Sequence, residues 1–445
     1  MVNVIARRVG AAVSSMAVPR DLTAIARRNL RWELRSALLV PMAVACVEGN
    51  VLGVIANKAF EAPAWVVGLI VAAAPAANLT GFFWSTVLHG RERVRASNLF
   101  QLGVLVCVTA IAMAPLNEIG LAVLVVASCV ARLMMAGLVT ARGDLWRGNY
   151  SDAARARIAG RLAMAAAITV SATALLIGWA MDRSQLGGEE AYRWLFGVAV
   201  VLGGLGVFTF SRIRWRGGPT QLAGEFRSRA AGTGAGPRAM VGVLREDRFY
   251  RQYMTAQFIL GFSNLAAVPV FILALKDVFD PGYLTSLVLV QAVPMLMPVL
   301  TIPLWARLLG GVHVVQFRAY HSWLFFAAIG LAATGFLLRS EGAIMVGQII
   351  RGVAMGGGIL AWNLGHHDFA TRELANVYMG IHTTLTGVRG VIAPMVGAVL
   401  YSGISLPIAL AAEPVGLGAW VFVLLAGIAL IACLMFVRMH LATRS

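Results

Sequence analysis

The sequence predicts an all-α polytopic membrane protein whose twelve transmembrane helices form two pseudo-symmetric six-helix bundles. Three observations support this fold class: the apolar composition, the number and length of the apolar runs, and an internal repeat. The chain has 445 residues, of which 59% are hydrophobic and only 13% are charged, and its mean hydropathy is +0.78. A soluble protein with this balance would expose far too much apolar surface. We therefore expect the chain to lie in a lipid bilayer.

The apolar runs have the length of transmembrane helices. Each is about 20 residues long, and a helix of that length crosses a hydrocarbon layer of about 30 Å. Most connections between the runs are short, which predicts that neighbouring helices are antiparallel. The runs cover residues 37–57, 64–88, 97–115, 119–141, 159–181, 193–210, 252–275, 283–305, 319–338, 342–364, 378–401 and 415–437.

One long connection, residues 211–248, divides the chain. It is rich in Gly and Arg, it is too polar to bury a core, and it is predicted to be partly disordered. The basic, acid-poor residues 1–35 are expected to form a helix on the membrane surface, with an organellar transit peptide as the alternative. The predicted domains are a basic N-tail (1–36), an N-terminal bundle (37–210), a linker (211–248), a C-terminal bundle (249–438) and a C-tail (439–445).

The basic residues predict the orientation in the membrane. The net charge is +17, and most Lys and Arg residues lie in the tails and in alternate connections. By the positive-inside rule, both termini are expected to be cytoplasmic and the protein to reside in the inner or plasma membrane. This distribution accounts for the charge without a nucleic-acid partner. No cofactor or metal is expected either, because the four cysteines (Cys46, Cys107, Cys129 and Cys433) all lie inside apolar runs.

The two halves of the chain carry matching motifs, in the same order and about 220 residues apart. A chance origin is hard to reconcile with three such matches, and two parallel six-helix repeats are a transporter plan. The matches are Lys58-x4-Pro63-x-Trp65 with Lys276-x4-Pro281-x-Tyr283, Leu79-Thr80-x3-Trp84 with Leu300-Thr301-x3-Trp305, and Arg132-x4-Gly137 with Arg351-x4-Gly356.

With this plan, the sequence resembles the major facilitator superfamily (MFS) along all twelve predicted helices. The turn His89-Gly-Arg-Glu-Arg-Val-Arg95 corresponds to the family's basic loop between helices 2 and 3, with Val87 where the family usually has an aspartate. Arg132 corresponds to the arginine often found in helix 4. The antiporter pattern is absent from helix 5, and only a partial version, Gly390-x3-Pro394-x2-Gly397, occurs in helix 11. The resemblance implies an MFS-like fold in which two bundles rock about a site between them.

Three residues are candidates for proton coupling. Glu48 is the only acidic residue at the predicted membrane depth, and a carboxylate there can carry a proton. The alternative role is a structural ion pair with Arg132. His382 lies two helical turns before Arg389 and hence on the same face; it is either a proton carrier or a hydrogen-bonded packing residue.

The substrate candidates are two arginines and four uncharged side chains. A charge at membrane depth costs about 2.5–3.5 kcal/mol on insertion scales, and Arg351 and Arg389 have no acidic partner at their depth in the C-terminal half. Guanidinium binds carboxylate or phosphate well, so we expect a small anion near Arg389 and also near Arg351. The alternatives are an architectural role for Arg351, as the repeat partner of Arg132, and an amphipathic, drug-like substrate. The uncharged candidates are Asn78, Asn264, Gln291 and Trp362.

The sequence favours a monomeric, proton-coupled secondary transporter of a small solute. We find no nucleophile, base and orienting residue with the spacing of an enzyme. The run His366-His367-Asp368 fits a helix cap better than a metal site, because adjacent side chains on a helix diverge by about 100°. No Gly-x4-Gly-Lys-Ser/Thr loop for ATP is present. A non-transporting receptor or scaffold is the alternative from another class, and uptake, efflux, symport and antiport remain open.

Overall fold

The computed structural model describes residues 22–228, 237–371, 374–403 and 416–443. Within these ranges the regular structure is helical, and eleven helices are long and apolar enough to cross a membrane. A twelfth crossing is made by the shorter apolar segment Ala64–Thr80 together with the helix that follows it. The predicted fold class, an all-α multi-pass membrane protein, is confirmed.

The N-terminal half contains six crossings, two of which are interrupted. The first is made of α2 and α3, and the second of α4, a 3₁₀ turn η1 and α5. The bounds are α2 (Ala24–Ala45), α3 (Gly49–Lys58), α4 (Ala64–Ala77), η1 (Asn78–Thr80), α5 (Gly81–Leu88), α6 (Arg93–Ala112), α7 (Glu118–Asn149), α8 (Asp152–Met181) and α9 (Ala191–Ser211), with short turns η2 (Ser184–Leu186) and η3 (Gly188–Glu190).

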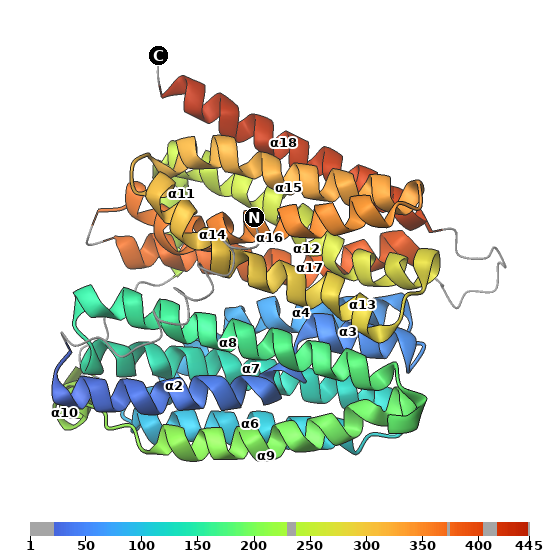
Figure 1. Ribbon diagram of the computed structural model, residues 1–445. Helices are drawn as coiled ribbons and strands as arrows, with labels where there is room; N and C mark the ends of the chain where they lie inside the picture. Colours follow the sequence, from blue (N-terminus) through green and yellow to red (C-terminus); the bar gives the residue numbers. More distant parts are fainter. Residues whose placement is uncertain (1–21, 229–236, 372–373, 404–415, 444–445) are drawn as a thin grey trace, which may run out of the picture.

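The C-terminal half repeats this order, and one of its crossings is interrupted by a π-helical turn. The bounds are α12 (Arg248–Phe279), α13 (Tyr283–Leu287), the π turn η4 (Val288–Ala292), α14 (Val293–Leu309), α15 (Val314–Leu337), α16 (Glu341–Leu364), η5 (Gly365–Asp368), α17 (Ala375–Ser402), η6 (Gly418–Trp420) and α18 (Val421–Ala442). Figure 1 shows the two halves as adjacent bundles, with α2 to α9 in one and α12 to α18 in the other.

Two boundary predictions need correction. The first helix begins at Ala24 and not at residue 37, because the Thr23 hydroxyl caps the Ala26 N–H and the basic residues that follow are good helix formers. The described part of the predicted N-tail therefore belongs mainly to this helix, whereas residues 1–21 lie outside the described residues. The predicted disordered linker holds α10 (Gly218–Ser228) and α11 (Pro237–Glu246), and residues 229–236 lie outside the described residues.

The linker helix α10 is attached to the N-terminal half by Glu225. One carboxylate oxygen accepts from Arg93 Nη2 at 2.6 Å and the other from the Gly90 N–H at 2.8 Å. Arg93 also pairs with Asp144 at the end of α7. Thus a carboxylate from the linker binds the basic turn that follows α5, where Val87 stands in place of the acidic residue expected from the family pattern.

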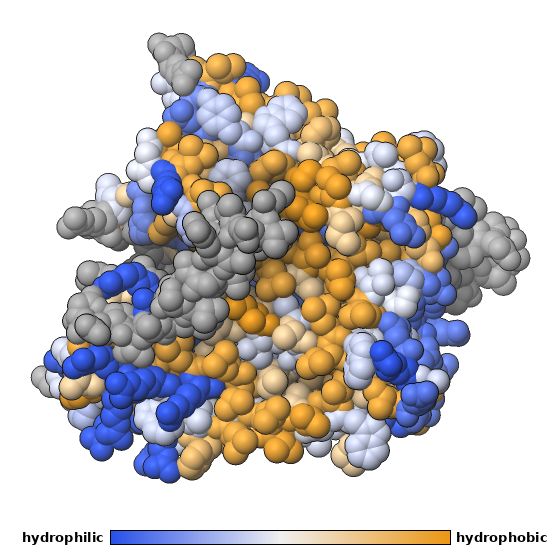
Figure 2. Space-filling model, in the orientation of Figure 1, coloured by the Kyte–Doolittle hydropathy of each residue, from blue (hydrophilic) through white to orange (hydrophobic). Residues whose placement is uncertain are grey.

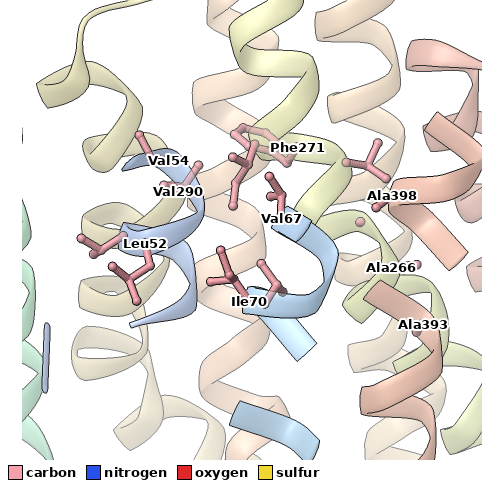
Figure 3. Close-up of a cluster of buried hydrophobic side chains, with 14 of the residues drawn as sticks. Leu52, Val54, Val67, Ile70, Ala266, Phe271, Val290, Ala393 and Ala398 are labelled. Atoms are coloured by element: carbon pink, nitrogen blue, oxygen red, sulfur yellow. The ribbon is translucent and has the colours of Figure 1, made fainter. Parts of the chain in front are cut away.

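The two halves share an apolar interface. Figure 3 shows Leu52 of α3 beside Val290 of η4 and Val67 of α4 beside Phe271 of α12, and all four side chains are buried. The outer surface in Figure 2 presents a broad apolar band, with hydrophilic residues gathered towards both ends of the helices. This distribution is the one expected for side chains that face lipid tails in the middle and water at the two ends.

Polar contacts hold the two halves together at one end. Lys58 pairs with Asp280 at 2.7 Å, and Lys276 donates to the Asn57 carbonyl at 2.7 Å. Asp182 accepts from the backbone N–H groups of Tyr283 and Leu284 at 2.6 and 2.9 Å, so a side chain of one half caps a helix of the other. This end lies opposite to the linker helices α10 and α11 (Figure 1). The structure is therefore closed at the end that is predicted to face away from the cytoplasm.

Replacing Asp182 tests this closure. We expect Asp182→Ala to leave two helix N–H groups without their charged acceptor, which weakens the closed end. A hydrogen bond to a charged group contributes about 1.5–3 kcal/mol, so thiol labelling of a cysteine placed at the buried Val54 should accelerate about tenfold. Glu118→Ala, which removes an exposed carboxylate from the same end, is the matched control. Equal labelling rates in the two variants would contradict the assigned role of Asp182.

Candidate functional site

The first transmembrane helix is broken at membrane depth. α2 ends at Ala45 and α3 begins at Gly49, so backbone groups between them lose their helical partners. Arg132 on α7 compensates, because its Nε and Nη2 donate to the Val47 carbonyl at 3.0 and 2.6 Å. Nη2 also pairs with Glu48 Oε2 at 2.8 Å. The ion pair considered from the sequence is therefore present, and it stabilises a helix break that the sequence did not reveal.

Glu48 is accessible whereas its partner is not. The Glu48 side chain is 26% exposed and the Arg132 side chain only 9%. The Glu48 carboxylate is thus partly open to its surroundings, while two hydrogen bonds to the Val47 carbonyl hold the guanidinium. Loss of the negative charge on Glu48 would leave the two bonds to that carbonyl intact.

A second contact joins this break to the other half. Asn50, two residues after Glu48, donates its amide to Gln291 Oε1 at 2.9 Å and to the Val290 carbonyl at 3.0 Å. Both acceptors lie in the π-helical turn η4, where the wider spiral changes the normal pattern of carbonyl bonds. Such single π turns occur often at functional sites. Gln291 was predicted to contact substrate, and here it lies across the interface from the broken helix.

Asn78 lies at the third irregular point. It begins the 3₁₀ turn that separates α4 from α5, and it is exposed. The turn packs against α17 of the other half. Asn78 is thus at the interface between the halves, in a separate place from the Asn50–Gln291 contact.

Arg351 and Asn264 face the same small pocket in the C-terminal half. The pocket is also lined by Gln348 and by the rings of Phe271 and Phe422. The contact between Arg351 Nη1 and Gln348 Oε1 is long, at 3.4 Å, and no carboxylate in the described part of the chain forms an ion pair with Arg351. Two of the predicted substrate residues are therefore brought together here.

Arg389 occupies a different place. Its Nη1 donates to the Gln257 carbonyl and its Nη2 contacts Thr386 Oγ1 at 3.3 Å. Gly387 lies against Leu79 of η1 and Gly390 against Pro75 of α4, both in the other half, and in a helix of 3.6 residues per turn Arg389 projects from a different face. Arg389 therefore points into its own bundle, away from the interface between the halves.

His382 and Trp362 lie on the same side as Arg389. The two rings meet edge to face with centroids 5.4 Å apart, and Trp362 Nε1 donates to Thr386 Oγ1 at 3.2 Å. His382 is 1% exposed. Glu48 and Arg132 belong to the other half, so the three predicted proton-coupling residues do not form one group.

Several buried polar residues lie outside the helices that the sequence predicts. Arg318 was placed in a connection because the predicted helix started at residue 319, but α15 starts at Val314 and Arg318 is 2% exposed. Glu33 was placed in the N-tail, but it is fully buried and accepts from Trp146 Nε1 at 3.2 Å. Extending each of these two predicted helices by one turn at its N-terminal end would have included both residues.

The histidine pair lies in η5, directly after α16. Within the described residues, no group of three or more His, Cys, Asp or Glu side chains is placed to hold a metal. The rings of His366 and His367 contact each other, and Asp368 Oδ2 accepts from the Val314 N–H at 2.6 Å. Asp368 thus caps α15 rather than its own helix.

Comparison with known proteins identifies the fold. No protein-family profile and no curated protein matches the sequence. Solved structures do: a mutant of the nucleoside transporter NupG (10% identity, TM-score 0.70, covering 92% of this chain and 100% of that one) and the xylose transporter XylE from E. coli in an inward-open conformation (11%, 0.63, 91% and 94%).

A mutant of the peptide transporter POT, in complex with sulfate, is similar as well (13% identity, TM-score 0.66, covering 92% of this chain and 94% of that one). At these identities the likeness concerns the fold and not the substrate. Together with the repeat and the two helical bundles, it shows that this chain has the fold of the major facilitator transporters.

Proposed function

We propose that the protein is a secondary active transporter that exposes a site between its two bundles alternately to the two sides of the membrane. The observation that carries this proposal is the broken helix α2–α3, where Glu48 pairs with Arg132 and Asn50 contacts the π turn of the opposite half. In transporters, discontinuous helices at the interface between repeats supply the groups that bind substrates and coupling ions. A receptor or scaffold has no need for a helix break stabilised by a buried arginine.

Glu48 is proposed to be the coupling group. Its side chain is partly exposed and its partner Arg132 has a second acceptor, the Val47 carbonyl. Protonation would therefore release the ion pair without unfolding the break. The Asn50–Gln291 contact, two residues away, offers a direct way to transmit this change to the other half.

The substrate is proposed to be a small anion bound near Arg351. This guanidinium lacks a carboxylate partner among the described residues, and the amides of Asn264 and Gln348 line the same pocket. α16, which carries Arg351, also contacts the π turn that holds Gln291. Arg389 is not included in this site, because it lies on the face of α17 turned away from the other half.

An amphipathic substrate is the second candidate. Phe271, Ile329 and Phe422 line the pocket beside Arg351, and rings and aliphatic chains favour apolar surface. In that case the protein exports drug-like compounds and Arg351 is structural. Competition assays with anionic, neutral and cationic solutes in proteoliposomes distinguish the two classes.

Replacing Glu48 by Gln tests proton coupling. Glutamine keeps the size and a hydrogen-bond acceptor for Arg132 but carries no titratable proton. In proteoliposomes with an imposed pH gradient, we expect Glu48→Gln to lose accumulation of substrate above its equilibrium level while exchange across the membrane continues. Glu341→Gln, an exposed carboxylate at the start of α16, should accumulate substrate normally. Normal accumulation by Glu48→Gln would exclude Glu48 as the coupling group.

Replacing Arg351 tests the anion site. Lysine retains the charge but not the planar fork that binds an oxyanion through two parallel hydrogen bonds. We expect Arg351→Lys to weaken binding of anionic substrates at least about tenfold, since a charge-assisted hydrogen bond contributes about 1.5–3 kcal/mol. The control is Arg307→Lys, at an exposed position in the same half. Unchanged affinity in Arg351→Lys and Arg351→Gln would rule out an anion at this position and favour the amphipathic substrate.

A further inference from the structure

The C-terminal half contains a second group of buried basic side chains, apart from the pocket of Arg351. It consists of Arg318 and His321 on α15 and of His382 and Arg389 on α17, and α12 packs against both helices. We call these four residues the basic core. Each of them is 5% exposed or less.

The hydrogen bonds of the basic core go to neutral acceptors. Arg389 donates to the Gln257 carbonyl and to Thr386 Oγ1. His321 Nε2 donates to the Ala354 carbonyl at 2.8 Å, so its Nδ1 accepts from Arg318 Nη1 at 3.3 Å. None of these acceptors carries a charge that could balance a guanidinium.

Several polar atoms of the basic core have no hydrogen-bond partner among the described residues. They are Nε of Arg318, Nε of Arg389 and both ring nitrogens of His382. Buried donors normally have partners, and a charged one without a partner carries a large desolvation cost. His382 and Arg389 are seven residues apart on α17 and hence project from the same face, and the charges of Arg318 and Arg389 act on each other and on His382.

The charges in this region do not cancel. Neither Arg318 nor Arg389 forms an ion pair with a carboxylate in the described part of the chain. One carboxylate, Asp368, lies near enough to act on the neighbouring Tyr253, and it is bound to the Val314 N–H. Two guanidiniums and one carboxylate leave a surplus of one positive charge, which a single monovalent anion would balance.

The backbone is shaped to admit the guanidinium. Gly261 of α12 faces Arg389, and a Cβ atom at this position would lie 2.2 Å from Arg389 Cζ. A side chain there would displace Arg389. The glycine at position 261 of α12 thus leaves room for the Arg389 guanidinium in the core of the bundle. An apolar residue in place of Arg389 would pack there without a charge that needs to be balanced.

We propose that the basic core binds a small monovalent inorganic anion, such as chloride, between the Arg318 and Arg389 guanidiniums, with a ring N–H of His382 as a further donor. The site is separate from the proposed transport site, because Arg389 lies on the face of α17 turned away from the other half. The bound anion is retained during transport and stabilises the packing of α15 and α17 on α12.

Thermal unfolding of the purified full-length protein tests this site. The protein is exchanged into potassium gluconate, and its Tm is measured while chloride, bromide or sulfate replaces gluconate at constant ionic strength. A ligand that binds only the folded state stabilises it, so chloride and bromide should raise the Tm by about 2 °C or more. Sulfate, which is larger and divalent, should not. The variants Arg318→Met and Arg389→Met should lose the halide response, whereas Arg351→Met should retain it.

Gly261→Ala, which displaces Arg389, should also lose the response, and Gly330→Ala on α15 is its control, because a Cβ atom there meets no other atom. A wild-type protein without a halide response, or variants of Arg318 and Arg389 that respond as the wild type does, would overturn the proposal. If the arginine variants do not fold, anomalous scattering from bromide-soaked wild-type crystals decides: a peak between Arg318 and Arg389 supports the site, and its absence overturns it.

Discussion

The bonds from Arg132 to the Val47 carbonyl and to Glu48 make the broken first helix possible. The hydrocarbon layer offers no water to an unsatisfied carbonyl, so a break at this depth requires a donor from the protein. Once the break exists, Glu48 becomes accessible and Asn50 can reach the π turn of the other half. The proposed coupling group and the contact between the halves therefore depend on the same guanidinium.

The other arginines of the interior have two further kinds of surroundings. Arg351 lies in a small pocket that the amide side chains of Asn264 and Gln348 also line. Arg318 and Arg389 are enclosed within one bundle, where neutral acceptors satisfy part of their donors. We interpret the first as part of the proposed transport site and the second as a fixed anion site that maintains helix packing, because Arg389 lies on the face of α17 turned away from the other half.

The sequence predicted the fold class well because hydropathy and the repeat are properties of long segments. The pairing of Glu48 with Arg132 was also accessible, since few charges lie at that depth. The direction of the Arg389 side chain could not be predicted from the sequence, because only packing decides which face of α17 meets the other half. Arg318 was missed because apolar runs start later than helices do. The bond from Glu225 to the basic turn after α5 joins segments far apart in the sequence, and composition alone gave no signal for it.

We propose that the halves meet and separate at the broken helix during transport. A short thiol-specific cross-linker between Asn50→Cys and Gln291→Cys tests it most directly, in a background without the four native cysteines. In this conformation Asn50 Nδ2 and Gln291 Oε1 are 2.9 Å apart, so cross-linking of cysteines at these two positions should be efficient. We expect transport in proteoliposomes to stop on cross-linking and to return when the linker is cleaved. Full transport by the cross-linked protein would contradict it.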